Sequence, residues 1–152
     1  MKVSIDTSIL LDLLLNQNVE SIEKLRKHLG EYDELAICGV VYGELYPILT
    51  RSNLDIDLFL SELGIRFEEA GKEVYCFAGK KWNEYRRRRR FVCPVCGKSI
   101  KLKCPQCSSG IDFRQHILAD FIIGAFSELS CDGLLTRDLG YYRTYFPRLK
   151  LF

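Results

Sequence analysis

Three observations predict an α/β fold with a mainly parallel sheet for this 152-residue chain. Short apolar stretches that suit buried strands alternate with longer segments of helical periodicity. The first strand, residues 2–5, ends on Asp6 and turns at once into an apolar helix. Hydrophobic residues make up 47% of the chain, enough for one substantial core. Strands that alternate with helices imply a mostly parallel sheet with helices on both faces.

The periodicity assigns the elements in order along the chain. Strands are expected at residues 2–5, 35–38, 65–68, 133–136 and 148–152, and helices at 9–15, 21–29, 40–50, 54–63, 69–87, 115–129 and 141–146. Pro47 lies inside the third helix and predicts a kink or an irregular start there.

Residues 91–110 differ in composition from the rest of the chain and are rich in Cys, Pro, Gly and Ser. They are expected to form an inserted module, with residues 1–90 and 111–152 forming the α/β domain. The longest apolar stretches are interrupted by Asp12 and Asp120 and are shorter than the roughly 18 residues that a membrane span needs. We therefore expect a cytoplasmic protein without a membrane segment or a signal peptide.

The net charge of +2 conceals an uneven distribution. Residues 72–104 contain eleven Lys and Arg against two acidic residues, a net +9, whereas the remainder has eleven basic and eighteen acidic residues, a net −7. An acidic body with one strongly basic segment indicates a polyanionic partner that binds this segment, the alternative being a solvated charged face.

Four acidic residues stand out along the chain. Asp6 and Asp138 each follow a predicted strand, and Glu44 and Asp120 lie on otherwise apolar predicted helices. Ligand sites of α/β sheets lie at the carboxyl ends of the strands, and clustered carboxylates bind Mg²⁺ or Mn²⁺. Such a site activates water for attack on a phosphodiester. For each acid alone, a helix cap or a surface charge is the alternative.

Four motifs together resemble the PIN-domain pattern, in the same order and with similar spacing. They are DTS at residues 6–8, YGEL at 42–45, LADFIIGA at 118–125 and LTRDL at 135–139. The resemblance implies a metal-dependent ribonuclease with a three-layer α/β/α sandwich and a five-stranded sheet. Asp6, Glu44, Asp120 and Asp138 would then be the catalytic acids, with Thr7 and Thr136 as supporting hydroxyls. Pro47 and the insertion depart from the pattern.

The same resemblance has implications for partners. Many single-domain PIN proteins of this size are VapC-like toxins, which form homodimers and are inhibited by a small antitoxin. A toxin and an RNA-maturation nuclease are not separated by these residues. The alternative from another class is a non-catalytic RNA-binding scaffold.

Two C-P-x-C turns lie in the insertion, CPVCG at residues 93–97 and CPQCS at 104–108. Such turns present thiolates to one tetrahedral Zn²⁺, and four cysteines close the coordination shell of a structural site. The predicted ligands are Cys93, Cys96, Cys104 and Cys107. A redox dithiol pair and an iron–sulfur centre are the alternatives. The other three cysteines, Cys38, Cys76 and Cys131, lie on apolar patterns and are expected to be buried thiols.

Basic residues flank these cysteines, and arginine both binds phosphate and stacks on bases. We therefore expect the insertion to bind RNA, with docking of an acidic protein partner as the alternative. The predicted RNA-binding residues are Arg86, Arg87, Arg88, Arg89, Arg90, Lys98, Lys101 and Lys103.

Overall fold

The computed structural model describes residues 1–15, 18–31, 34–88, 91–92, 96, 98–100, 102–111 and 117–152. The main strands are β1 (Lys2–Ile5), β2 (Glu34–Cys38), β3 (Ile65–Glu68) and β8 (Gly133–Leu135). The helices are α1 (Thr7–Leu15), α2 (Val19–Glu31), α3 (Gly39–Arg51), α4 (Ile56–Glu62), α5 (Lys72–Arg88), α6 (Leu118–Ser130) and α7 (Leu139–Tyr145).

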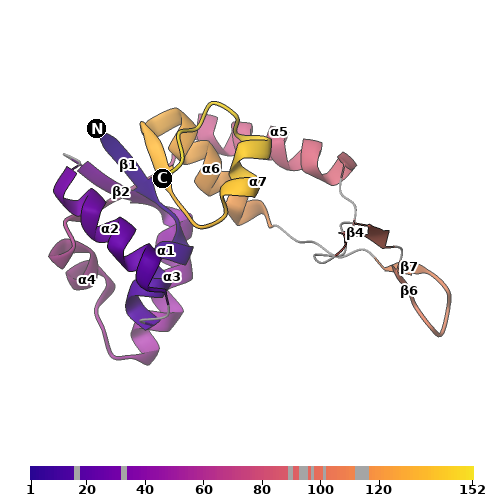
Figure 1. The fold of residues 1–152 in the computed structure, drawn as a ribbon, viewed down its shortest axis with the longest axis horizontal. Helices are drawn as coiled ribbons and strands as arrows, with labels where there is room; N and C mark the ends of the chain where they lie inside the picture. Colours follow the sequence, from indigo (N-terminus) through magenta and orange to yellow (C-terminus); the bar gives the residue numbers. More distant parts are fainter. Residues whose placement is uncertain are drawn as a thin grey trace.

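The four main strands form one parallel sheet in the order β3-β2-β1-β8. Each connection between neighbouring parallel strands contains helices, which follows from the length that a crossover needs. Figure 1 shows α1–α4 on one side of β1 and β2 and α5–α7 on the other. The predicted α/β fold with a parallel sheet is confirmed.

The predicted fifth strand is shorter than expected. Leu151 makes an isolated parallel bridge with Leu134 of β8. Two backbone hydrogen bonds hold it, from Leu134 N to Lys150 O at 2.9 Å and from Phe152 N to Leu134 O at 3.0 Å. Turns occupy residues 147–149, so only the last residues reach the sheet. The described sheet therefore has four strands and this one bridge, not five strands.

Successive side chains along a strand point alternately toward the two helical layers. Val3 and Ile5 of β1 are fully buried in the apolar core, whereas Ser4 between them forms a hydrogen bond with Ser127 of α6. Phe121 of α6 anchors the second layer, where its ring contacts several aromatic rings of α5 and α7. Parallel sheets covered on both faces are expected to bury their strands in this way.

The helices place two of the residues discussed in the sequence. Pro47 lies inside α3, which is continuous from Gly39 to Arg51. Cys76 is exposed, not buried, because α5 turns Val74 and Ala78 toward the core and Cys76 away from it. Cys38 is buried as predicted, and Cys131 is half-buried.

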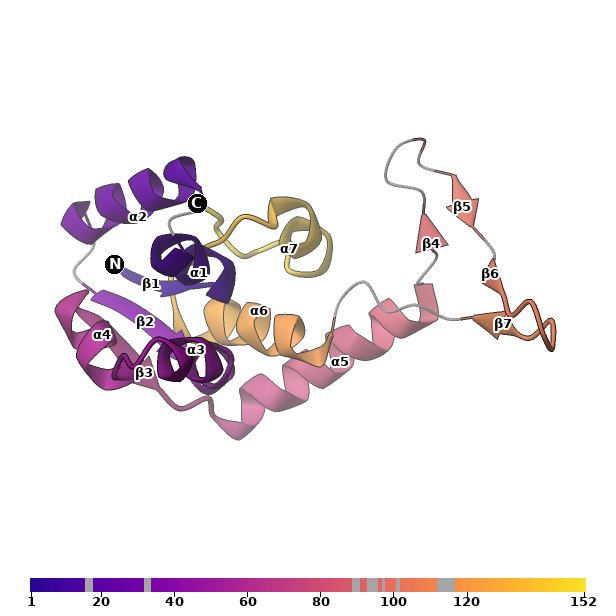
Figure 2. The same ribbon diagram turned by 90° about the horizontal axis from the view of Figure 1, so that it is seen from below.

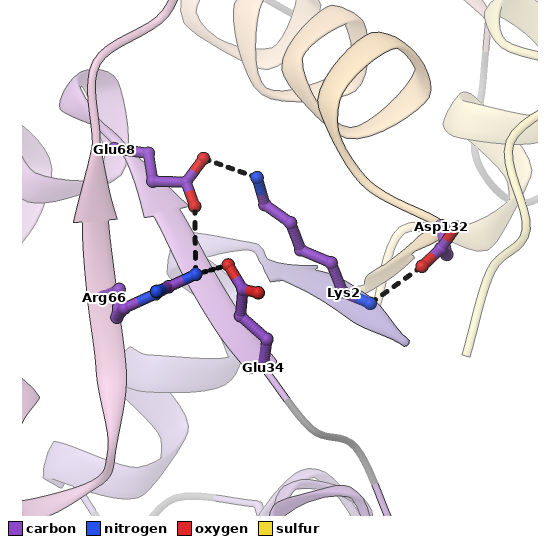
Figure 3. A network of polar contacts seen from close by, with 5 residues as sticks. All are labelled: Lys2, Glu34, Arg66, Glu68 and Asp132. Atoms are coloured by element: carbon purple, nitrogen blue, oxygen red, sulfur yellow. Dashed lines mark hydrogen bonds and ion pairs between the residues drawn. The ribbon is translucent and has the colours of Figure 1, made fainter.

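A polar network crosses the edge of the sheet at the start of β1 (Figure 3). The Lys2 ammonium donates to Glu68 of β3 at 2.6 Å, and the Lys2 backbone N donates to Asp132 at 2.8 Å. Arg66 forms ion pairs with Glu34 and, at 3.8 Å, with Glu68. The Arg66 side chain is 62% exposed, so its ion pairs contribute little to stability.

The insertion contains two separate two-stranded antiparallel sheets, and in the sequence each C-P-x-C motif lies between the two strands of one sheet. β4 (Phe91–Val92) pairs with β5 (Ser99–Ile100), and β6 (Leu102–Lys103) pairs with β7 (Gly110–Ile111). Both views place these strands beyond the C-terminal end of α5, away from the main sheet (Figures 1 and 2). The chain then returns to the body at the N-terminal end of α6.

In the described part of the chain, none of the helices combines the length and the apolar character that crossing a membrane requires.

The contact between α6 and the end of α7 provides a test of the packing. A Cβ added at Gly124 would lie 2.3 Å from Cε2 of Phe146, whose side chain is fully buried. Because that ring has no space into which to move, Gly124→Ala is expected to lower the free energy of unfolding by about 1 to 3 kcal/mol in urea denaturation.

The matched control is Gly79→Ala in α5, where an added Cβ meets nothing within 4 Å. There the better helix propensity of alanine is expected to raise the free energy of unfolding by about 0.5 to 1 kcal/mol. Equal effects of the two substitutions would contradict the packing of α6 on α7.

Candidate active site

Asp6 lies at the carboxyl end of β1, in the middle of the sheet. Its backbone N continues the strand pairing by donating to Leu135 O at 3.0 Å. Its Oδ2 accepts hydrogen bonds from Thr136 Oγ1 at 2.6 Å and from Ser8 Oγ at 2.9 Å. Burial raises the pKa of the Asp6 carboxyl, and the hydrogen bonds from Thr136, Ser8 and the backbone partly oppose that shift.

Glu44 of α3 is half-buried and accepts a hydrogen bond from the Thr7 hydroxyl at the start of α1. Burial raises the pKa of the Glu44 carboxyl, the Thr7 hydrogen bond opposes the shift, and the negative charges of Asp120 and Asp6 add to it. The three acidic groups are therefore near enough to repel one another.

Asp120 and Asp138 each cap a helix. Asp120 Oδ2 accepts from Ile117 N at 2.8 Å in a capping box of α6, and Asp138 Oδ1 accepts from Tyr141 N at 3.1 Å at the start of α7. The sequence predicted a helix over residues 115–129, which would place Asp120 beyond its first turn. That placement is wrong, because α6 begins at Leu118 and Asp120 lies in its first turn. Both residues occupy the capping positions considered as alternatives, and both also face the cavity described next.

The four acids meet at one cavity of about 450 Å³. They come from four separate parts of the fold, namely the end of β1, α3, the first turn of α6 and the loop after β8. The cavity is lined by Asp6, Thr7, Ser8, Leu11, Glu44, Asp120, Arg137 and Asp138. The structure therefore brings all four predicted acids together, as well as the predicted supporting residue Thr7.

Thr136, the second predicted supporting residue, lies behind the cavity wall. It is buried and bridges two acids, because its hydroxyl donates to Asp6 and accepts from the backbone N of Asp138 at 3.1 Å. The sequence prediction missed Ser8 and Arg137. Ser8 follows Asp6 and Thr7 directly, and Arg137 lies between Thr136 and Asp138. Both residues could therefore have been predicted from their adjacency to predicted site residues.

The donor set suits a hard divalent cation. Four carboxylates share one cavity. Burial raises the pKa of Glu44, and the negative charges of Asp120 and Asp6 add to that rise, a repulsion that a cation would relieve. In the parts of the chain described here, no three His, Cys, Asp or Glu side chains lie close enough to hold one ion between them as they stand. The acids instead line the cavity and are held there by hydroxyl and amide donors.

Cys93, one of the four predicted zinc ligands, lies outside the described residues. The three that the structure describes, Cys96, Cys104 and Cys107, do not form a metal-binding group. The second C-P-x-C turn is nevertheless compact: Ser108 N donates to Cys104 O at 2.9 Å, and Ser108 takes a positive φ of 59°. Hydrogen bonds with Ser109 and with Cys104 lower the pKa of the Cys107 thiol.

The described RNA-binding candidates are exposed on the far end of α5 and on the insertion. They are Arg86, Arg87, Lys98 and Lys103. Arg88 ends α5, and Arg89, Arg90 and Lys101 lie outside the described residues.

The fold is similar to several solved structures over nearly its full length. The VapBC2 complex from Rickettsia felis, bound to a DNA fragment from its promoter, matches with a TM-score of 0.65 and 15% identity over 100% of this chain and 98% of that chain. A toxin-antitoxin complex from Klebsiella pneumoniae matches with a TM-score of 0.62 and 16% identity over 97% and 94% of the two chains. VapC20 from Mycobacterium tuberculosis, a Sarcin-Ricin loop cleaving toxin, matches with a TM-score of 0.55 and 13% identity over 97% of this chain and 98% of that chain.

At identities this low, the structural matches show a similar fold and nothing further. That fold agrees with the expected PIN-like arrangement. No family model and no curated protein sequence matches the chain.

Because the Asp6 carboxyl is buried, we expect the stability of the metal-free protein to depend on pH. Because folding raises the pKa of Asp6, the folded state disfavours its ionised form, and stability is lost as the pH rises through the raised pKa. Asp6→Asn removes that ionisation. The variant is expected to have the higher melting temperature at pH 7, with the difference from wild type shrinking toward pH 4.

The measurement is thermal unfolding in a chelating buffer across this pH range, with Asp57→Asn as control. Asp57 is an exposed acid of α4 outside the cavity. A melting temperature for Asp6→Asn at or below that of wild type at pH 7 would contradict the burial of an ionised Asp6.

Proposed function

We propose that this protein is a divalent-metal-dependent endoribonuclease whose active site is the acidic cavity at the carboxyl edge of the sheet. The observation that supports this most is the convergence of four carboxylates from four separate elements on one cavity. Structural carboxylates are normally dispersed or paired with cations, whereas acids that share a cavity are typical of a metal-assisted hydrolase.

The assigned roles follow from the contacts. Asp6, Glu44, Asp120 and Asp138 would hold Mg²⁺ or Mn²⁺, which when bound supplies Lewis-acid stabilisation and an activated water. Thr136 and Ser8 orient the Asp6 carboxylate, and Thr7 orients that of Glu44. Their hydrogen bonds favour the ionised acids, which is the form a cation needs.

The comparisons support RNA as the substrate and a small antitoxin as a partner. Among the similar structures, one is VapBC2 bound to a DNA fragment from its promoter, one is a toxin-antitoxin complex, and one is a Sarcin-Ricin loop cleaving toxin. We propose the same arrangement here, including the homodimer expected from the sequence. An RNA-maturation nuclease would use the same cavity and differ only in its partner and its target.

The insertion is proposed to bind RNA beside the cavity. It leaves the body at the end of α5 and returns at the start of α6, the helix whose first turn carries Asp120 (Figure 2). The exposed Arg86 and Arg87 lie at the same end of α5. RNA held by this basic segment would thus be tethered next to the acids, which offsets the repulsion between the acidic body and the phosphate backbone.

Zinc is proposed as the structural ion of the insertion. In the sequence, each C-P-x-C motif lies between two strands that pair antiparallel, and in the second motif the Cys104 and Cys107 side chains lie within hydrogen-bond distance. Thiolate donors in this number suit a closed tetrahedral zinc site. The structure does not bring Cys96 to this pair, so the two hairpins would have to approach each other when they share one ion.

Ribonuclease activity is tested by incubating single-stranded and structured RNA with the purified protein and Mn²⁺. Wild type is expected to cleave, and Asp6→Asn is expected to lower the rate by about 100-fold or more, because the ion loses the central carboxylate. Asp57→Asn serves as the matched control and is expected to cleave like wild type.

Equal cleavage by wild type and Asp6→Asn would contradict the assignment. The scaffold alternative is distinguished by thermal shift: millimolar Mn²⁺ should raise the melting temperature of wild type by binding the folded state, and should not do so for Asp6→Asn. RNA binding without cleavage and without this shift would favour the scaffold.

Zinc is tested by metal analysis and limited proteolysis. The protein is expected to contain one zinc per chain, and chelation is expected to make residues 91–110 sensitive to protease while the α/β body stays resistant. Cys107→Ser should abolish zinc retention, and Cys76→Ser, at an exposed cysteine of α5, should not. Unchanged protection of the insertion after complete zinc removal would contradict a structural role for the ion.

A further inference from the structure

Asp12 in α1 is a buried carboxylate whose only described ion-pair partner is Arg137. Its side chain is 2% exposed, and its Oδ1 lies 3.1 Å from Nη1 of Arg137. The other oxygen, Oδ2, is buried and has no hydrogen-bond partner among the residues that the structure describes. Burying a carboxylate is costly unless a cation compensates it, so Asp12 depends on Arg137.

Arg137 is the cation of the acidic cavity. It lies in the loop after β8, between Thr136, which bonds Asp6, and Asp138. It lines the same cavity as the four acids, and no other residue of that lining carries a positive charge. Its side chain is 50% exposed, and among the described residues Asp12 is the only acid that forms an ion pair with its guanidinium.

The pairing gives this arginine a fixed place. A half-exposed arginine normally samples many rotamers, and ordering it costs conformational entropy on binding. The buried Asp12 fixes one Nη atom of the guanidinium, while half of the Arg137 side chain remains accessible at the cavity. Guanidinium groups have five donors in a rigid plane, and this plane matches the oxygens of a phosphate group.

We propose that Arg137 binds the phosphate group of the RNA that enters the acidic cavity, and that Asp12 is a positioning residue acting through Arg137. The inference rests on the proposed ribonuclease function and names a residue for contact with the substrate anion. The carboxylates alone repel a phosphodiester. A fixed cation in the same lining offsets this repulsion and orients the phosphate group beside the acids.

The first test measures binding without cleavage. A short single-stranded RNA is titrated at several salt concentrations onto Asp6→Asn protein that carries a second substitution. Adding Arg137→Gln is expected to weaken binding and to reduce the slope of log Kd against log salt by about one, as expected for the loss of one phosphate contact. Adding Arg143→Gln, at an exposed arginine of α7 outside the cavity, is expected to change neither quantity.

The second test measures cleavage by wild type and single variants. Arg137→Gln is expected to lower kcat/KM by about 10- to 100-fold, the usual effect of losing a hydrogen bond to a charged group. Arg137→Lys keeps a positive charge beside Asp12 and is expected to fold normally yet lose activity, because an ammonium lacks the planar donor set.

Asp12 is tested by a double-variant cycle. Asp12→Asn is expected to lower kcat/KM in the wild-type background and to have no further effect in the Arg137→Gln background, because Asp12 acts through Arg137. A merely structural pair would change the melting temperature and leave kcat/KM per folded molecule unchanged. The double variant removes both charges, so it leaves no buried charge unpaired even where one single variant fails to fold.

The outcomes separate this inference from the proposed function. If wild type cleaves and Asp6→Asn does not, but Arg137→Gln and Arg137→Lys cleave like wild type, the role of Arg137 is overturned and the ribonuclease assignment stands. If wild type does not cleave RNA, the assignment fails, and the salt dependence of binding still decides whether Arg137 contacts phosphate. An unchanged slope for Arg137→Gln overturns that contact.

Discussion

The gathering of partly buried carboxylates at one edge of the sheet is the constraint on which the candidate site depends. The carboxyl ends of parallel strands lie at the same edge of a sheet. Because β1 and β8 are neighbouring parallel strands, Asp6 and Asp138, which follow them, lie at one cavity. Glu44 and Asp120 then join them from α3 and α6. Burial raises the pKa of both Asp6 and Glu44, so folding without a cation disfavours the ionised forms of these carboxyls.

Neighbouring donors hold the acids in this unfavourable arrangement. Thr136 links the loop after β8 to Asp6, Thr7 holds Glu44, and backbone amides at the starts of α6 and α7 hold Asp120 and Asp138. The capping interactions therefore have two consequences, because each stabilises a helix end and also directs a carboxylate toward the cavity. The buried pair of Asp12 and Arg137 adds one fixed positive charge to the same lining. These contacts prepare a site for a cation and an anionic substrate together.

Much of this arrangement could be predicted from the sequence. Strand–acid junctions at Asp6 and Asp138 are local features, and the parallel sheet follows from alternating strands and helices. Asp120 was identified for a wrong reason, since its place in the first turn of α6 depends on where the helix begins. The ion pair of Asp12 with Arg137 was not predictable, because it joins residues far apart in the sequence and arises only when α1 packs beside the loop after β8. The reach of the last strand and the exposure of Cys76 likewise depend on packing.

The most direct test of the central claim is anomalous diffraction at the manganese edge from crystals grown with Mn²⁺. The account predicts a manganese peak inside the acidic cavity, with carboxylate oxygens of Asp6 and at least one of Glu44, Asp120 and Asp138 at about 2.0 to 2.2 Å, as expected for hard cations of this size. A cavity without manganese at saturating Mn²⁺, with ordered density for all four carboxylates, would contradict the account.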